Sequence, residues 1–241
     1  MPLFDGRTTR GWDYLQGGRE QVPPPGHVTA ANGELRLLGA ADTSGASVPF
    51  GYLATVQKFQ NYQLQLEFRW GERRYAPRAL AKRNSGIMYH LSPDSDPARE
   101  SAVEFQIQES NVGDIVAINM RGLEAPAPGG TPSWPSWPSW KPRAYAEPSV
   151  NGGISRQWFR SAGDFEYRDS WNRLDIIAFG DQAAHLVNGR IVAAIFGLRR
   201  SLQENGPPPN SGRIALQVEA AEIAFRNIRL RGIDHPTDVQ L

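Results

Sequence analysis

Asn84-Ser-Gly-Ile-Met-Tyr-His-Leu91 and Val103-Glu-Phe-Gln-Ile-Gln108 are the two segments of this sequence that decide its fold. In the first segment one face would carry Ser85, Ile87, Tyr89 and Leu91, and the other face Asn84, Gly86, Met88 and His90. In the second segment Val103, Phe105 and Ile107 alternate with Glu104, Gln106 and Gln108. Because successive side chains of a strand point to opposite faces, both patterns predict strands with one largely apolar face and one polar face.

The polar face of these two strands has two interpretations. One is a half-solvated antiparallel sheet, whose outer face is polar because water covers it. The other is a ligand site, because amides, a carboxylate and an imidazole stand where an ordinary wet face carries Lys, Thr and Glu. Such groups suit a polyhydroxylated ligand. The side chains concerned are Asn84, His90, Glu104, Gln106 and Gln108.

The composition narrows the classes of partner. The chain has 241 residues and a formal net charge of +1, which gives no indication of nucleic acid or an anionic membrane surface as partner. It contains no Cys, so disulfides, thiolate metal sites and thiol catalysis are excluded. No apolar run reaches the length of a membrane span. The oligomeric state is not indicated by the sequence.

Several further segments alternate in the same way. In the clearest of them, residues 63–70, the side expected to face the core carries Leu64, Leu66, Phe68 and Trp70. About a dozen short strands in total, with hairpin turns such as Asn188-Gly189 and no βαβ pattern, favour an all-β sandwich of two sheets. We therefore predict a single jelly-roll domain over residues 1–241, with a loose tail at about 233–241.

Residues 122–160 are rich in Pro and Gly and are expected to form a long loop insertion. Within it, Trp134, Trp137 and Trp140 recur at every third position. A polyproline II helix has three residues per turn, so the three rings could project from one side. They would then stack on sugar rings, or they would fold back onto the sandwich as a lid. Both interpretations remain open at this point.

An ordered set of short motifs extends from residue 3 to about residue 231. They are Leu3-Phe-Asp-Gly6 with Gly11-Trp12, Leu66-Glu-Phe-Arg-Trp70, Asn84-Ser-Gly-Ile87, Glu104-Phe-Gln-Ile107 with Glu109, Trp171-Asn172, His185-Leu-Val-Asn-Gly189, Gly212-Arg-Ile-Ala-Leu-Gln217 and Phe225-Arg-Asn-Ile228. In this order they resemble the 3-keto-disaccharide hydrolase family, formerly a domain of unknown function. The resemblance implies a concanavalin-A/laminin-G-like jelly-roll β-sandwich whose concave sheet binds a saccharide. The Trp-Pro repeat departs from the family's usual pattern, so it could alter substrate choice.

The resemblance also implies a reaction, which is hydrolysis or elimination of the glycosidic bond of a 3-keto-glycoside. A ketone at C3 makes the hydrogen on C2 acidic, and the enediolate left by its removal expels the group at C1. Such a site needs a base near C2, an electrophile for the C3 oxygen and an acid for the leaving group. A divalent metal ion could be that electrophile, although the sequence identifies no ligand set. The resemblance further implies a periplasmic or secreted protein.

The candidates for acid, base or metal ligand are Glu104, His185, Glu109 and His90. We expect Glu104 and His185 on one polar face, within reach of one sugar, although a structural His185 is an equal alternative. Strict alternation turns Glu109 inward unless the strand ends or bulges after Gln108. The candidates for substrate binding are Arg69, Asn84, Gln106, Gln108, Trp134, Trp137 and Trp140. For Arg69, a cross-strand salt bridge is the alternative to a role in the site.

Two other functions stay open. A non-catalytic glycan-binding module needs only the stacking Trp residues and the amides. A conventional jelly-roll glycoside hydrolase is suggested by the run from Glu104 to Glu109, which is similar to the Glu-x-Asp-x-x-Glu strand of jelly-roll endoglucanases. The middle Asp is missing here and the second Glu is displaced by one position. Retaining hydrolysis needs two carboxyl groups about 5–5.5 Å apart, which simple strand geometry does not give this pair.

Overall fold

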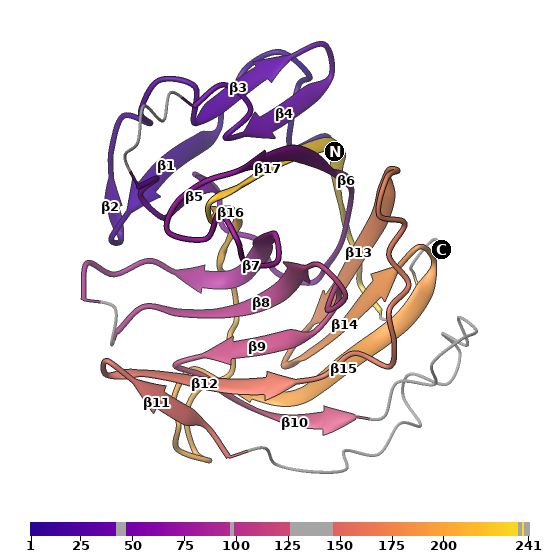
Figure 1. Cartoon of the computed structure of the whole chain (residues 1–241). Helices are drawn as coiled ribbons and strands as arrows, with labels where there is room; N and C mark the ends of the chain where they lie inside the picture. The colour runs from indigo at the N-terminus through magenta and orange to yellow at the C-terminus, as the bar shows by residue number, and fades with distance from the viewer. Residues whose placement is uncertain (42–46, 97–98, 126–146, 236–237, 239–241) are drawn as a thin grey trace.

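The computed structural model describes residues 1–41, 47–96, 99–125, 147–235 and 238, leaving aside the side chains of residues 124 and 125. Within these residues the chain forms seventeen strands and no α-helix, and the strands make two curled antiparallel sheets packed face to face (Figure 1). This is the jelly-roll β-sandwich that the sequence predicts. The described part of the chain accordingly holds no helix able to cross a membrane.

The first sheet has nine strands in the order β11-β12-β9-β8-β7-β16-β5-β1-β2. Its members are β1 (Trp12–Gln16), β2 (Arg19–Glu20), β5 (Gly51–Thr55), β7 (Asn84–Ser92), β8 (Ser101–Gln108), β9 (Ile115–Ile118), β11 (Ser149–Asn151), β12 (Ile154–Phe159) and β16 (Arg213–Val218). The two strands that carry the polar pattern, β7 and β8, are neighbours near the middle of this sheet. Their polar face is therefore flanked by further strands on both sides.

The second sheet has eight strands in the order β10-β15-β14-β13-β6-β17-β4-β3. Its members are β3 (Val28–Ala31), β4 (Glu34–Leu37), β6 (Tyr62–Arg74), β10 (Arg121–Ala125), β13 (Asn172–Phe179), β14 (Gln182–Val187), β15 (Arg190–Arg199) and β17 (Ala221–Gly232). The late strand β17 pairs with both β6 and β4 and so lies inside the sheet. The two halves of the chain are thus interleaved in this layer.

The hydrophobic core lies between the two sheets and follows from the alternation along their strands. Phe68 of β6 and Ile87 and Phe105 of β7 and β8 are completely buried in it. Burying a side chain of this size stabilises a fold by about 1.5–3 kcal/mol. The predicted strands at 63–70, 84–91 and 103–108 are confirmed, because they lie within β6, β7 and β8.

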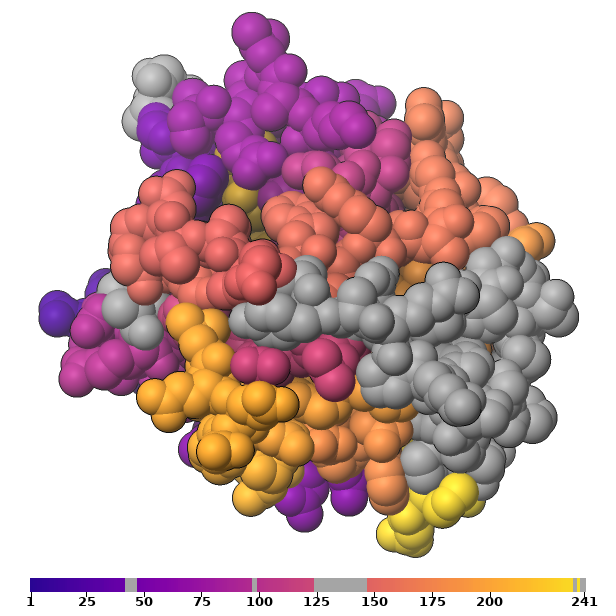
Figure 2. Space-filling view, turned by 90° about the horizontal axis from the view of Figure 1, so that it is seen from below, coloured from indigo at the N-terminus to yellow at the C-terminus, as the bar shows by residue number. Residues whose placement is uncertain are grey.

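The range 122–160 is not the continuous loop that its composition indicates. Most of β10 and all of β11 and β12 fall within it, and β12 pairs with β9. Seen from below, residues near 150 and the loop after β15 share one face of the molecule (Figure 2).

Trp134, Trp137 and Trp140 lie outside the described residues, as does most of the tail predicted at 233–241. Ile233, at the start of that tail, is buried.

A β-bulge near the end of β7 changes the faces predicted there. The register of β7 against β8 shifts between Tyr89 and Ser92, and His90 has a φ of 50°. Leu91 consequently packs beside Met88 on the outer face of the sheet instead of in the central core. The prediction that His90 shares the polar face with Met88 is wrong, because strict alternation does not continue through a bulge.

Candidate functional site

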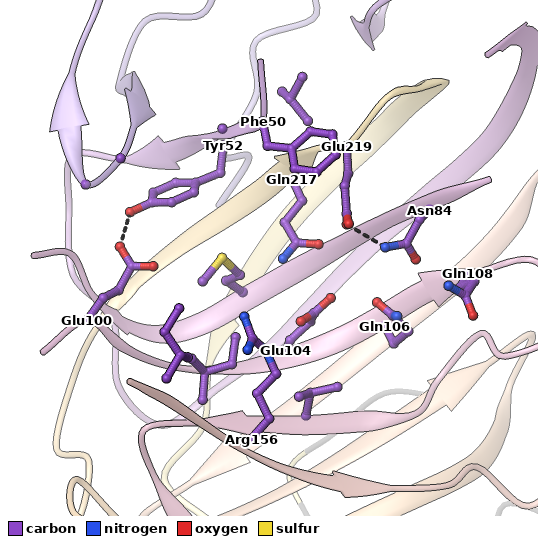
Figure 3. Close-up of a pocket in the computed structure, with 18 of the residues that line it drawn as sticks. Phe50, Tyr52, Asn84, Glu100, Glu104, Gln106, Gln108, Arg156, Gln217 and Glu219 are labelled. Atoms are coloured by element: carbon purple, nitrogen blue, oxygen red, sulfur yellow. Dashed lines mark hydrogen bonds between the residues drawn. The ribbon is translucent and has the colours of Figure 1, made fainter. Parts of the chain in front are cut away.

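A pocket of about 400 Å³ lies on the outer face of the nine-stranded sheet, on the side of β7 and β8 that faces away from the core (Figure 3). All three predicted amide side chains and one of the two predicted carboxylates line it: Asn84, Gln106 and Gln108, and Glu104. Its remaining lining side chains and glycines are Gly17, Gly18, Phe50, Gly51, Tyr52, Arg78, Met88, Asp94, Glu100, Val116, Ile118, Ile154, Arg156, Trp158, Gln217, Val218 and Glu219. The polar pattern of the two strands is therefore the floor of a pocket.

Gly86 makes room for the acidic group at the centre of this floor. It lies on β7 between β8, which carries Glu104, and β16, which carries Gln217. A β-carbon on Gly86 would lie 2.6 Å from an Oε1 atom of each of these two side chains. Both side chains therefore extend over the backbone of β7, and only glycine leaves them that space.

Glu104 is buried and surrounded by amides. The Gln106 amide nitrogen, oriented to face the carboxylate, donates to Oε1 of Glu104 at 2.6 Å. Burial raises the pKa of Glu104 to about 8, and the nearby Glu219 carboxylate adds to this rise. The charge of Arg156 and a hydrogen bond from Gln217 act in the opposite direction. A carboxyl group of this kind can hold a proton at neutral pH and is a strong base once it has lost it.

Glu219 is a second acidic residue of the pocket, and its carboxylate is already paired with two other side chains. Asn84 donates to its Oε2 through Nδ2, and Arg78 forms an ion pair with its Oε1 at 2.6 Å. Burial raises the pKa of Glu219, while Arg78 and Asn84 lower it. Glu219 and Arg78 lie just outside regular strands, so sequence alternation gives no indication that they belong to the site.

Arg156 places a positive charge on the wall of the pocket that β12 forms. Its guanidinium group points from β12 toward Glu104 (Figure 3), close enough to lower the pKa of both Glu104 and Glu219. Arg156 is partly buried. The alternation of β12 could have indicated it, but Gln157 and Ser155 on the inward face remove the contrast between the two sides.

Two groups at the end of the pocket are linked to each other. The Tyr52 hydroxyl donates to Oε2 of Glu100 at 2.5 Å. Burial raises the pKa of Glu100, and burial together with the Glu100 hydrogen bond raises the pKa of Tyr52. In contrast, Oε1 of Gln217 is buried and has no hydrogen-bond partner among the described residues. It is an acceptor left for a ligand hydroxyl.

His185 does not reach the pocket, and the prediction that it shares a face with Glu104 is wrong. Its ring is fully buried between the two sheets, stacked on Phe105 with centroids 4.2 Å apart. Nδ1 lies 3.0 Å from the Gly113 carbonyl and Nε2 lies 3.0 Å from the Tyr89 hydroxyl. Burial lowers the pKa of His185 to about 3. These contacts give it the structural role that was the alternative interpretation.

Glu109 also lies away from the pocket. Beyond the end of β8 its carboxylate accepts hydrogen bonds from the backbone and side chain of Arg83, the shortest at 2.6 Å, and lies 3.4 Å from Arg74. Burial opposes its ionisation, but the hydrogen bonds and charge of Arg83 and the charge of Arg74 lower its pKa overall. The group is held as a structural anion.

The two remaining predicted residues lie elsewhere as well. His90 is buried behind the bulge of β7 and does not line the pocket. Arg69 lies on the other sheet, where its guanidinium group is 3.6 Å from Glu34 and 4.7 Å from the centroid of the Trp171 ring. The salt-bridge interpretation of Arg69 therefore describes its contacts. The described residues contain no cluster of three or more acidic, His or Cys side chains arranged to hold a metal ion.

The protein is a jelly-roll domain of a carbohydrate-active family. The chain belongs to the family of 3-keto-alpha-glucoside-1,2-lyase-like domains, which matches residues 1–231. A comparison with curated proteins gives no match.

Solved structures of similar fold share little sequence with this chain. One is a candidate glycosyl hydrolase from Parabacteroides distasonis, 14% identical with a TM-score of 0.54, covering 96% of this chain and 93% of that one. Another is a Bacillus licheniformis β-glucanase, 9% identical with a TM-score of 0.54 and 96% coverage of both chains. A third is the carbohydrate-binding module CBM66 from Bacillus subtilis, 10% identical with a TM-score of 0.53, covering 92% and 96%. At such identities the likeness concerns the fold alone.

Proposed function

We propose that the protein cleaves the glycosidic bond of 3-keto-glycosides by removing the proton on C2. Removal of that proton gives an enediolate between C2 and C3. The enediolate electrons then re-form the C3 ketone as a C1–C2 double bond appears and the C1–oxygen bond breaks. Water adding across the C1–C2 double bond completes a net hydrolysis, and release before that addition is a net elimination.

Glu104 is the base in this proposal. It lies at the centre of the pocket floor, and a carboxylate with a pKa of about 8 is a stronger base than an ordinary one. After taking the C2 proton it is a neutral acid beside C1, so the same group supplies the proton that the leaving oxygen needs. One residue can therefore serve both steps. This proposal rests mainly on the buried Glu104 carboxyl group among hydroxyl-binding amides.

Arg156 is the electrophile for the C3 oxygen in this proposal. Its guanidinium group points toward Glu104 from the opposite wall, so an enediolate formed between them would lie beside a positive charge. In many enzymes the largest contribution to the rate enhancement comes from charges and dipoles placed where negative charge develops in the transition state. Asn84, Gln106, Gln108 and the unpaired Oε1 of Gln217 would hold the sugar hydroxyls.

The experiment is incubation of the protein with a 3-keto-glucoside, following the released leaving group and the released ketosugar. We expect turnover by the native protein and a loss of about 10²-fold or more in Glu104→Gln. Glu109→Gln is the matched control, because it neutralises a carboxylate outside the pocket, and it should keep most of the activity. Full activity in Glu104→Gln would refute the assignment. A parallel reaction with a chelator tests whether a metal ion contributes.

The same assay, extended to unoxidised glycosides and to sugar binding, separates the alternative functions. Sugar binding without turnover of any ketosugar would identify a glycan-binding module. Cleavage of unoxidised glycosides would identify a conventional glycoside hydrolase. We also propose a periplasmic or secreted location, which rests on the family alone and is tested by locating the protein in fractionated cells.

A further inference from the structure

Trp158 is an exposed aromatic side chain on the wall of the pocket. It lies on β12, on the same face as Ile154 and Arg156, and 37% of it is exposed. Large aromatic rings are usually buried, and an exposed ring at the wall of a pocket offers a flat apolar surface to a ligand.

Asp114 fixes the orientation of this ring before any ligand arrives. Asp114 is 1% exposed, and its Oδ2 accepts a hydrogen bond of 2.8 Å from Nε1 of Trp158 and one of 2.8 Å from Arg160. Its Oδ1 accepts from the Ser161 backbone at 2.7 Å. Arg160 lies over one face of the indole, 4.7 Å from the ring centroid, and does not line the pocket. The opposite face of the ring is therefore the one left for the pocket, and little entropy is lost in ordering it.

A cross-strand row connects this ring to the acidic centre. Trp158 is paired with Val116 of β9, and Val116 is paired with Glu104 of β8. Two strand spacings separate the α-carbons of Trp158 and Glu104 by roughly 10 Å. In the proposed reaction Glu104 deprotonates C2, and the leaving group is bonded to the neighbouring carbon, C1. The leaving group can therefore extend toward the indole of Trp158.

The two sides of the pocket differ in chemistry. On the side of β7 and β16 it is lined mainly by hydrogen-bonding groups, among them Asn84, Gln217 and Glu219, together with the apolar Met88. On the side of β9 and β12, apart from Arg156, it is lined by Val116, Ile118, Ile154 and Trp158. The hydroxyl-rich ketosugar ring fits the first side, with its C3 oxygen reaching across to Arg156. The apolar surface beside Arg156 is then left for the group bonded to C1.

We infer that Trp158 and the apolar side chains around it form a subsite for a leaving group with a flat apolar face, that is, an aryl group, and that Asp114 is the positioning residue of this subsite. The inference rests on the proposed function in one respect, because the action of Glu104 at C2 determines where the leaving group lies.

The first test compares two substrates that differ only at C1, a phenyl and a methyl 3-keto-glucoside of the same anomeric configuration. In Trp158→Ala, kcat/KM should fall about tenfold or more for the phenyl substrate and stay within about twofold for the methyl substrate, since loss of a stacked ring costs on the order of 1–3 kcal/mol and 1.4 kcal/mol is tenfold. Trp158→Phe should recover most of the difference. An equal loss on both substrates, or no loss on either, would overturn the subsite.

Two further variants separate positioning from folding. Asp114→Asn should raise KM for the phenyl substrate while leaving kcat and the methyl substrate nearly unchanged, whereas a general structural defect would affect both substrates alike. Trp171→Phe, directly before β13 of the other sheet, is the matched control for replacement of a tryptophan and should change the kinetics of neither substrate.

The second test does not depend on turnover. Calorimetry with the unoxidised phenyl and methyl glucosides should show tighter binding of the phenyl compound to the native protein and loss of that preference in Trp158→Ala. A native protein that turns over neither ketosugar but keeps this preference would retain the subsite and refute the proposed chemistry. A native protein without the preference would overturn the subsite.

Discussion

Gly86 lies beneath the carboxylate of Glu104, and a β-carbon at position 86 would stand 2.6 Å from Oε1 of that carboxylate. The atoms that it would meet belong to two flexible side chains, Glu104 and Gln217, and the two closest are terminal oxygens that can move aside. The backbone at Gly86 is not in a left-handed conformation. Replacement by alanine therefore disturbs the site more than the fold.

We predict that Gly86→Ala lowers kcat/KM for a 3-keto-glucoside by about tenfold or more, because the proposed base is displaced. The free energy of unfolding should change little, since a Gly→Ala change at a compatible position gains about 0.4–1 kcal/mol through the unfolded state. Steady-state kinetics and chemical denaturation measure the two effects. Gly232→Ala, where no atom lies within 4 Å of the new carbon, is the matched control. A strongly destabilised Gly86→Ala protein would contradict this prediction.

Glu104→Gln should gain stability relative to the native protein as the pH rises. The folded-state pKa of Glu104 is about 8, while a Glu in an unfolded chain titrates near 4.3. Between these values the folded state holds a proton that the unfolded chain has released, so this group's contribution to stability is complete below pH 4.3 and is lost as the pH rises through 8. The amide of Gln at this position cannot ionise, so the variant does not lose this stability as the pH rises.

Denaturation curves of both proteins at pH 4, 6 and 9 measure this difference. The stability of Glu104→Gln minus that of the native protein should be most positive at pH 9. A difference that does not vary with pH would show that Glu104 titrates normally. The native turnover rate should rise toward pH 8, because the proposed base must be ionised.

His185→Phe should destabilise the fold without changing the chemistry of the pocket. The substitution leaves the Tyr89 hydroxyl and the Gly113 carbonyl without their partner, which costs about 1–3 kcal/mol for each buried group. Turnover of a 3-keto-glucoside at pH 7.5, well below the melting temperature, should stay within about threefold of native. A loss of 10²-fold in a folded variant would restore His185 to the site.

The pH dependence of stability gives His185 a second test. Its folded-state pKa is about 3, while a His in an unfolded chain titrates near 6.5. The stability it contributes is complete above pH 6.5 and is lost as the pH falls toward 3, because only the unfolded chain takes up the proton. His185→Phe should therefore show a smaller decline between pH 6.5 and 3 than the native protein. A variant whose stability declines as steeply as that of the native protein would contradict this prediction.

Glu109→Gln should lower the free energy of unfolding by about 1–3 kcal/mol. It removes the charged partner of Arg83, whose side chain is only 15% exposed and stacks over Trp70. Urea denaturation measures the loss. Arg99→Gln, which breaks ion pairs of an exposed arginine, is the comparison and should cost much less. Equal effects would mean that the burial of Arg83 contributes nothing.

Alternation was enough to place Glu104, Gln106 and Asn84, because each strand pairs a clearly apolar face with a clearly polar one. It failed for His185, since its strand β14 is apolar on both faces. Ala183 and Val187 face the central core together with His185, while Ala184 and Leu186 pack on the other side.

Residues brought in from outside the strands were beyond local sequence reasoning. Glu219 and Arg78 lie in connections, and only the pairing of distant strands brings them to the pocket. His90 was misplaced because nothing in the local sequence marks the bulge at which alternation stops. The fold can be predicted because it follows from many repeated local patterns. The site depends on a few contacts between residues that are far apart in the sequence.

The position of β17 affects how the eight-stranded sheet assembles while the chain is being synthesised. Residues 221–232 occupy the place between β4 and β6, so the middle of the eight-stranded sheet stays open while the preceding residues are synthesised. Pairings over such sequence separations form slowly and leave strand edges exposed meanwhile. A nascent chain that stops before residue 221 would carry two unpaired edges at its centre, and we expect such truncations to aggregate or to require chaperones.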